Sequence, residues 1–416
     1  MKKNRLAVTA AVLLLAASVL LSACGITGSD NNTQSAENSA KTSASTDAGK
    51  GSSGTTASPA KQNAQAETAS YSSGEESELF TERDLAQEAD TDDAETITVS
   101  DGAAITITEA GVYILTGSAE EACVTVDAED DAKVQFVLDG VSIVNSEQPC
   151  ILVENADKVF LTSAEGSENV FAVSGSFAGD EDAAVFSRDD LVLNGQGTVT
   201  VSSSEDGIRT NDDLKLTGGA WYVSASGSAL KAHDSILADG GEYFITAGSD
   251  GLHAEDNDDD TFGSIVIEGG TFDIDAGDDG VHATTTATVN DGTLTIDAAE
   301  GIEATQVILN GGTVTVRATD DGVNAGRKSN ALSVKIEING GIITVVMGSG
   351  DTDAVDSNGD LVITGGTIDI TAQSPFDYDG GCTYTGGTII VNGSQTNSVT
   401  NQMMGGRGGF GGGRPM

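Results

Sequence analysis

Apolar and polar residues alternate in short runs along the middle of the chain, and glycine pairs separate the runs. The apolar positions of residues 264–276 are Ile265, Ile267, Phe272 and Ile274. A period of two is typical of β-strands with one buried face. The pair Gly269-Gly270 lies between the two runs, and glycine favours the positive φ angles of a tight turn. The pattern therefore predicts short strands joined by tight turns.

Two motifs repeat about every 21–22 residues between residues 191 and 391, where fixed periods indicate stacked structural units. Glycine pairs begin at Gly218, Gly240, Gly269, Gly311, Gly340, Gly365 and Gly386. An acidic residue followed by glycine recurs at Asp206, Asp250, Asp279, Glu300 and Asp321. Each unit holds three short strands, and units advancing by ~4.8 Å form a parallel β-helix. Right-handed winding follows from the usual hand of parallel crossovers. The predicted fold is an all-β, right-handed parallel β-helix.

The repeat predicts which side chains stack between neighbouring coils. Trp221 falls in an inward column with Tyr243 and Phe272, so we expect it in the core. Tyr222 and Phe244 have the outward parity and form an exposed aromatic pair. Such a pair can stack on a sugar ring, or it can pair across strands without a ligand.

Two coils carry insertions, at residues 255–263 and 326–332. Both follow the same strand of the repeat, so we expect them at one corner of the β-helix. Insertions on one face of a solenoid usually mark the binding face.

The acidic residues of the second motif should form a column along one corner. Carboxylates about 5 Å apart repel by roughly 3 kcal/mol at an effective dielectric of 20. Calcium would relieve this repulsion, because it accepts carboxylates and turn carbonyls in flexible geometry. Each aspartate is also explained by ordinary turn chemistry. The candidate calcium ligands are Asp250, Asp256, Asp258, Asp278, Asp279, Asp320 and Asp321.

A second outward column is polar and mixed in charge: Arg209, Lys231, His253, His282, Glu303, Asn324 and Asp356. Such a strip suits hydrogen bonding to a hydroxyl-rich polymer. The candidate ligand-binding residues are therefore Tyr222, Phe244, His253, His282 and Asn324. A zinc site at His253 and His282 lacks a clear set of further ligands.

The net charge and the N-terminal segment indicate which partners the protein has and where it is located. The formal net charge of −46 makes nucleic acid an unfavourable partner. Residues 1–23 have the layout of a signal peptide, and the sequence around Cys24 resembles a bacterial lipobox. We expect lipidation of Cys24 and anchoring to the outer face of the cell membrane, outside the cytoplasm.

The remaining boundaries follow from composition. Residues 24–94 are rich in Ser, Thr, Ala and acidic residues, which predicts a disordered tether. Residues 95–395 form the β-helix, and residues 396–416 form a Gly-rich disordered tail. Cys123 and Cys150 should lie one above the other, either as a disulfide or as stacked free thiols.

The segments 105–117, 133–141 and 156–161, followed by the D-G-V-H-A coils, resemble a known family. It is the family of secreted clostridial carbohydrate-binding β-helix proteins, formerly a domain of unknown function. The resemblance implies a calcium-binding, right-handed parallel β-helix that adheres to plant-wall polysaccharides such as cellulose or pectin. Ser228 and Glu300 replace aspartate in the acidic column, which departs from a regular cation site there.

The function predicted from the sequence is non-catalytic binding of polysaccharide by a monomeric, calcium-binding surface lipoprotein. One alternative is a calcium-dependent uronate lyase, in which Lys231 or Arg209 would be the base. A second alternative is a structural adhesin or wall spacer.

Overall fold

The computed structural model describes residues 79–349 and 352–401. The leader, Cys24, residues 24–78 of the expected tether and most of the Gly-rich tail lie outside these residues. Among the described residues, no helix has the length and apolar character needed to cross a membrane.

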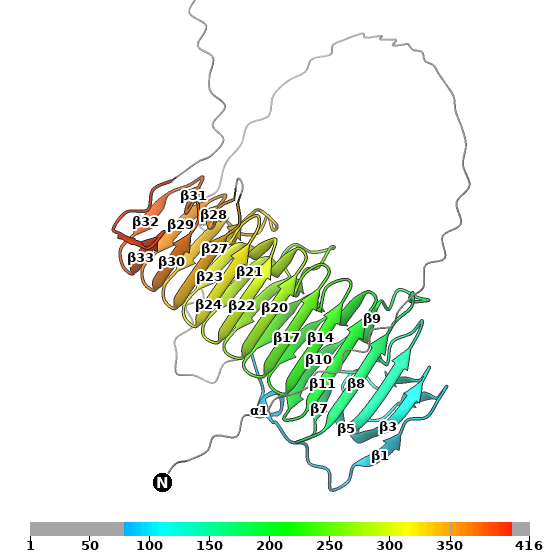
Figure 1. The fold of residues 1–416 in the computed structure, drawn as a ribbon. Coiled ribbons are helices and arrows are strands. Elements are labelled where there is room, and N and C mark those ends of the chain that lie inside the picture. The colour runs from blue at the N-terminus through cyan, green and yellow to red at the C-terminus, as the bar shows by residue number, and fades with distance from the viewer. Residues whose placement is uncertain (1–78, 350–351, 402–416) are drawn as a thin grey trace, which may run out of the picture. The chain divides into compact units, whose positions relative to one another are not determined.

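The described residues form a parallel β-helix, as predicted, in which each coil contributes a strand to three faces (Figure 1). The first face contains β1 (Glu95–Thr98), β3 (Gly111–Glu120), β5 (Lys133–Asn145), β7 (Lys158–Ser163), β10 (Asp190–Gly195), β13 (Asp213–Leu216), β16 (Ser235–Ala238), β19 (Ser264–Ile267), β21 (Asp279–Val289), β23 (Glu300–Leu309), β26 (Lys335–Ile338), β29 (Asp360–Ile363) and β32 (Cys382–Tyr384). The long strands β3, β5, β21 and β23 turn a corner and continue into a neighbouring face.

The second face contains β8 (Glu168–Val173), β11 (Thr198–Ser203), β14 (Ala220–Ala225), β17 (Glu242–Ala247), β20 (Thr271–Ala276), β22 (Thr293–Ala298), β24 (Thr313–Ala318), β27 (Ile342–Met347), β30 (Thr367–Thr371) and β33 (Thr388–Val391). The third face contains β2 (Ala104–Ile107), β4 (Cys123–Asp127), β6 (Ile151–Asn155), β9 (Ala183–Ser187), β12 (Asp206–Thr210), β15 (Leu230–Ala232), β18 (Leu252–Ala254), β25 (Val323–Ala325), β28 (Val355–Ser357) and β31 (Asp377–Tyr378). The exception to parallel pairing is β34 (Ser394–Thr396), which folds back antiparallel on β33.

The predicted register is confirmed in the core. Trp221, Tyr243 and Phe272 are paired in successive strands of the second face, and all three are buried. The rings of Tyr243 and Phe272 stack with centroids 4.9 Å apart. The indole nitrogen of Trp221 donates to the carbonyl of Gly218 at 2.9 Å, so its polar atom is satisfied inside the core.

The two glycine motifs have different physical causes. The second glycine of each pair has a positive φ, as at Gly270 with φ +98°. The glycine of the D-G motif has no such angle, and the motif begins a strand rather than a turn. A Cβ at Gly280 would lie 2.2 Å from Cγ2 of Ile296 and 2.7 Å from the carbonyl oxygen of Gly301. A larger residue would therefore not fit against the next coil at this position, and glycine is required there.

The end of the expected tether differs from the prediction. Residues 79–94 are described, and α1 (Glu82–Leu85) forms there with a capping box between Thr81 and Asp84. This segment lies against the first face, with Asp84 fully buried. The prediction that disorder extends to residue 94 was therefore wrong for residues 79–94, because long-range polar contacts order them.

Cys123 and Cys150 lie in adjacent coils of the third face, just before the paired residues Val124 and Ile151. Both thiols are free. The structure therefore corresponds to the stacked-thiol alternative.

Candidate functional site

The residues predicted to bind a ligand divide between two faces. Tyr222 and Phe244 lie on β14 and β17 of the second face. His253, His282 and Asn324 lie on β18, β21 and β25 of the third face. They therefore do not form one site, and each face has to be considered separately.

On the second face, Tyr222 and Phe244 are paired in register and their side chains point outward. Their ring centroids are 4.7 Å apart with an interplanar angle of 13°. Tyr222 is 46% exposed. Parallel strands hold the two rings one strand spacing apart, so together they present a rigid aromatic surface.

The aromatic pair lies in a shallow groove of about 870 Å³ on the second face. Its other outward-facing lining residues are Thr200, Ser202, Ser224, Thr246, Asp273, Asp275 and Asp297. Hydroxyls both donate and accept hydrogen bonds, and carboxylates accept them. The groove thus combines an aromatic platform with the hydrogen-bonding groups that sugar hydroxyls require. We call it the aromatic groove.

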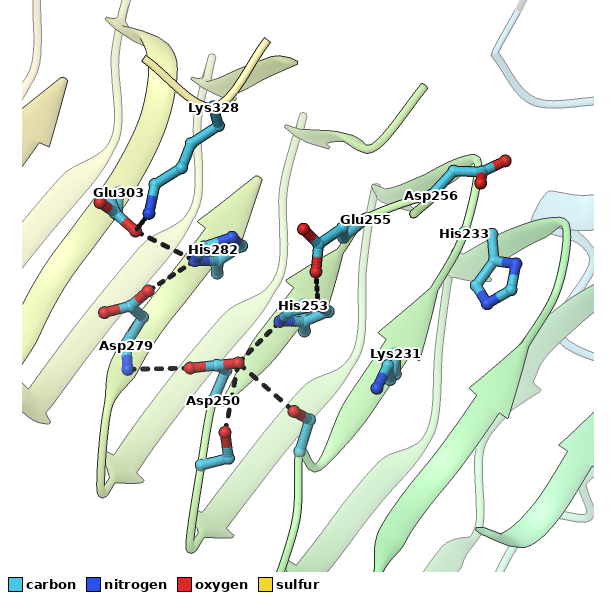
Figure 2. Close-up of polar contacts among 12 residues, drawn as sticks. Lys231, His233, Asp250, His253, Glu255, Asp256, Asp279, His282, Glu303 and Lys328 are labelled. Atoms are coloured by element: carbon cyan, nitrogen blue, oxygen red, sulfur yellow. Dashed lines mark hydrogen bonds and ion pairs between the residues drawn. The ribbon is translucent and has the colours of Figure 1, made fainter. Parts of the chain in front are cut away.

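On the third face, two histidines stack above two buried aspartates of the D-G corner, and Figure 2 shows this arrangement. Nδ1 of His253 lies 2.6 Å from Oδ2 of Asp250, and Nδ1 of His282 lies 2.6 Å from Oδ2 of Asp279. The imidazole centroids are 4.8 Å apart, and the two ring planes are nearly parallel. Oδ1 of Asp250 also accepts the backbone N–H of Asp279 at 3.0 Å. Both aspartates are thus already hydrogen-bonded within the protein.

His282 is the centre of a charged cluster. Its Nδ1 also lies 3.1 Å from Oε2 of Glu303, and the same oxygen is 2.7 Å from Nζ of Lys328. Burial opposes a charged imidazole, but the bonds to Asp279 and Glu303 outweigh it and raise the pKa of His282 to about 10. Burial, together with the Glu303 charge, raises the pKa of Asp279 to about 6 despite its bond to His282. We place the proton on His282, since two carboxylates face it.

The two insertions meet across this corner, as their predicted position on one side implied. Oδ2 of Asp260 in the first insertion accepts hydrogen bonds from the backbone N and the Nδ2 of Asn330 in the second, at 2.8 and 2.9 Å. Glu255 reaches His253 at 3.3 Å, and Lys328 reaches Glu303. The first insertion therefore brings a carboxylate to His253, and the second brings an ammonium group that balances Glu303.

Beyond Glu303 the corner is more acidic. Burial and neighbouring carboxylates raise the pKa of Glu300 to about 7, that of Asp321 to about 6 and that of Asp356 to about 7. Asn324 donates from Nδ2 to Glu300 at 2.8 Å, whereas its buried Oδ1 has no hydrogen-bond partner. Asn324 is 8% exposed. A buried acceptor next to crowded carboxylates fits a cation better than it fits another acceptor.

The seven predicted calcium ligands do not converge. Within the described ranges, Asp279 is the member that belongs to a group of three potential ligand atoms, and its companions are His282 and Glu303. Asp278 and Asp320 are exposed beside the corner. In the first insertion, Oδ1 of Asp256 accepts the backbone N–H of Asp258, so these two shape their own loop. One oxygen of Asp250 and one oxygen of Asp279 already bond to an imidazole.

The two candidate catalytic bases are held in ion pairs. Nζ of Lys231 lies 3.3 Å from Asp206, and the Arg209 guanidinium lies 2.6 Å from Asp182. Both partners lie on the third face or next to it. Each candidate base is therefore already engaged by a carboxylate of the protein.

Comparison with known proteins decides the family. Residues 101–372, well over half of the chain, match the family model described as "Carbohydrate-binding domain-containing protein". The chain belongs to this family. The resemblance noted in the sequence is thereby confirmed.

Two similar proteins are found, one by sequence and one by structure. A carbohydrate-binding domain-containing protein of Acetivibrio thermocellus is 33% identical over 122 residues, covering 28% of this chain and 43% of that protein. The match thus spans less than half of the relative. A solved structure described as a polysaccharide lyase-like protein from C. thermocellum, in a gadolinium derivative, covers 72% of this chain and 97% of that one, with 22% identity and a TM-score of 0.40.

Sequence reasoning missed two contributors to these contacts. Lys328 was part of an insertion but was not connected with Glu303, because loop geometry is not visible in a repeat pattern. Asp84 lay within a region expected to be disordered. The Thr81-x-x-Asp84 capping pattern was the available local signal for order there.

Proposed function

We propose that this protein binds polysaccharide through the aromatic groove without transforming it. The observation that carries the proposal is the exposed, rigid stack of Tyr222 and Phe244 within a hydroxyl-lined groove, on a chain of a carbohydrate-binding family. Aromatic rings pack against the apolar faces of sugar rings, and the groove hydroxyls bond to the sugar hydroxyls. Successive coils repeat these groups along the groove, which suits an extended polymer.

The charge of the aromatic groove favours a neutral glycan. Asp273, Asp275 and Asp297 are exposed in its lining, and Arg317 at 3.5 Å from Asp297 is the nearby counter-charge. Such a surface repels uronate chains at low salt. We therefore propose a cellulose-like ligand for this face.

Binding without catalysis is supported by the position of the basic residues. Lys231 and Arg209 are tied to carboxylates on the third face, whereas the aromatic groove lies on the second. A lyase base has to be neutral and has to reach the sugar carbon that loses its proton.

Calcium remains part of the proposal, at the part of the acidic column that includes Asp321, one of the ligands expected from the sequence. Asp321 and Asp356, with Oδ1 of Asn324, are the residues that would hold it, because these carboxylates are crowded and the amide oxygen is unsatisfied. A bound calcium would neutralise the corner and join successive coils. Its proposed role is structural.

We also propose that the protein is anchored outside the cytoplasm through lipid on Cys24. A binding surface held outside the cytoplasm suits capture of an external polymer.

The test is a pair of truncations in the aromatic groove. Tyr222→Ala and Phe244→Ala are each expected to weaken retention on cellulose by at least ~10-fold, or ~1.4 kcal/mol. The matched control is Phe262→Ala, because Phe262 is exposed to a similar degree but lies in the first insertion on the other face. Cellulose binding that survives both truncations would contradict the proposal. Unsaturated products from polygalacturonate, lost in Lys231→Ala, would instead establish lyase activity.

A further inference from the structure

Residues 79–88, which we call the strap, cross the outer side of the first face before the β-helix begins. Figure 1 shows α1, the helical part of the strap, beside the strands of the early coils. Arg83 donates to Gln135 on β5 at 3.1 Å and lies over the ring of Phe160 on β7, 4.6 Å from its centroid. Gln87 accepts from the backbone N–H of Gly195 at 3.1 Å. The strap thus spans several coils, as an extended polymer would.

The centre of the strap is a carboxylate held by two ammonium groups. Asp84 is 0% exposed. Its two oxygens lie 3.3 Å from Nζ of Lys158 and 3.4 Å from Nζ of Lys215. Lys158 and Lys215 come from different coils, β7 and β13, and both are buried. Lys158 also pairs with Asp190 of the first face at 3.2 Å. The first face therefore holds the strap carboxylate between two lysines, one of which it shares with Asp190.

The surface under the strap also contains polar, aromatic and aliphatic side chains, and the aliphatic one is Val192, which pairs with Phe160 and is fully buried. The side chains that point outward from the first face here are buried, although they alternate with the inward-facing core residues of the same strands. Besides Val192, they include Gln135, Lys158, Phe160, Thr162, Asn194 and Lys215. Gln135 donates to Thr162, and Thr162 donates to Asn194. An aromatic ring beside amides, hydroxyls and ammonium groups is the composition of a sugar-binding groove.

The strap itself is attached lightly. Asp84 is its one buried side chain, whereas Thr81, Glu82 and Glu88 are exposed and Leu85 is 41% exposed. None of its own apolar side chains is fully buried. Its contacts with the first face are hydrogen bonds, ion pairs and the packing of Arg83 on Phe160. Segments with few buried apolar contacts open at low free energy without unfolding the rest. The strap can therefore leave while the coils stay intact.

We propose that the groove beneath the strap is a second glycan site, specific for carboxylate-bearing sugar chains, and that the strap occupies it in cis. Asp84 takes the place of a sugar carboxylate between Lys158 and Lys215. The strap then governs access, and an acidic polymer and the strap exclude one another. This inference rests on the proposed function, and it separates neutral from acidic glycans by face.

The test compares two substitutions of equal charge in the strap. Asp84→Lys places an ammonium against Lys158 and Lys215 and releases the strap, whereas Glu82→Lys makes the same change at an exposed position. We expect Asp84→Lys to bind polygalacturonate at least ~10-fold more tightly than the wild type and Glu82→Lys. Cellulose binding should be equal in all three. Adding Lys158→Ala and Lys215→Ala to Asp84→Lys should remove the gain.

Hydrogen exchange at Gly195, whose N–H is covered by Gln87, reports strap release independently. Faster exchange in Asp84→Lys with polygalacturonate binding no tighter than in Glu82→Lys would overturn the inference. So would unchanged exchange, since the carboxylate would then not hold the strap, and Asp84→Ala provides the same readout without an added charge. Loss of cellulose binding in every protein, including the wild type, contradicts the aromatic groove instead and leaves the polygalacturonate comparison to decide on the strap.

Discussion

The third face balances its buried carboxylates with His282. Its imidazole contacts Asp279 and Glu303, and Lys328 completes an arrangement of two negative and two positive charges. Removing one member of a buried charge cluster leaves the others uncompensated, which is strongly destabilising. The polar column that contains His282 was predicted from the sequence. Its charge state was not, because it depends on burial and on Lys328, which lies in an insertion about 25 residues after Glu303.

His282 should make the free energy of unfolding fall as the pH rises into the alkaline range. Its folded pKa is raised to about 10, from an ordinary value near 6.5. A raised folded value means that the contribution is complete below about pH 6.5 and is lost as the pH rises toward 10. We expect His282→Gln to lower the free energy of unfolding by about 2 kcal/mol at pH 6 and by much less at pH 10, measured by urea denaturation.

His233→Gln is the control for this window. Burial, with Arg209 nearby, lowers the pKa of His233, so its proton change falls below pH 6.5. A difference between wild type and His282→Gln that stays constant from pH 6 to pH 10 would show that the imidazole is not charged in the fold.

At the scale of elements, the coil pattern was predictable because it depends on local alternation. Trp221, Tyr243 and Phe272 were placed in one inward column from sequence spacing, and the strands pair in that register. The strap was not predictable, because its order depends on Lys158, 74 residues further along the chain. The division of the ligand candidates between two faces was also missed. The spacing shows which side chains point outward, but it does not show that outward-pointing side chains of different strands lie on different faces.

The glycine of the D-G motif gives a prediction for the coil. Gly280→Ala should destabilise the protein by about 3 kcal/mol, because the new methyl would meet Ile296 and the backbone of Gly301. Gly326→Ala is the matched control, since the nearest atom to its Cβ would be Oε1 of Glu303 at 3.7 Å. Thermal unfolding of the two variants side by side checks this. Equal midpoints would show that the coils shift freely to admit a methyl group.

For the whole molecule, the net charge of −46 is the dominant electrostatic feature. Charges of one sign repel within the folded chain, and salt screens them over ~10 Å at 0.1 M. We expect the melting temperature to rise by several degrees between ~0.02 and ~0.3 M sodium chloride, measured by calorimetry. At matched ionic strength, calcium should add a further rise if it binds as proposed, and Asp356→Asn should remove this extra rise. Equal effects of calcium and sodium would contradict a specific calcium site.

The antiparallel β34 has a consequence for how copies of this chain can associate. A stack of parallel strands ends in unpaired backbone groups, and such edges recruit strands from other molecules. On the second face, the last strand β33 already bonds to β34, which runs in the opposite direction. A strand from another copy would therefore meet a three-residue edge strand of opposite direction instead of the longer parallel edge of β33, which makes this face a poorer template for fibril growth.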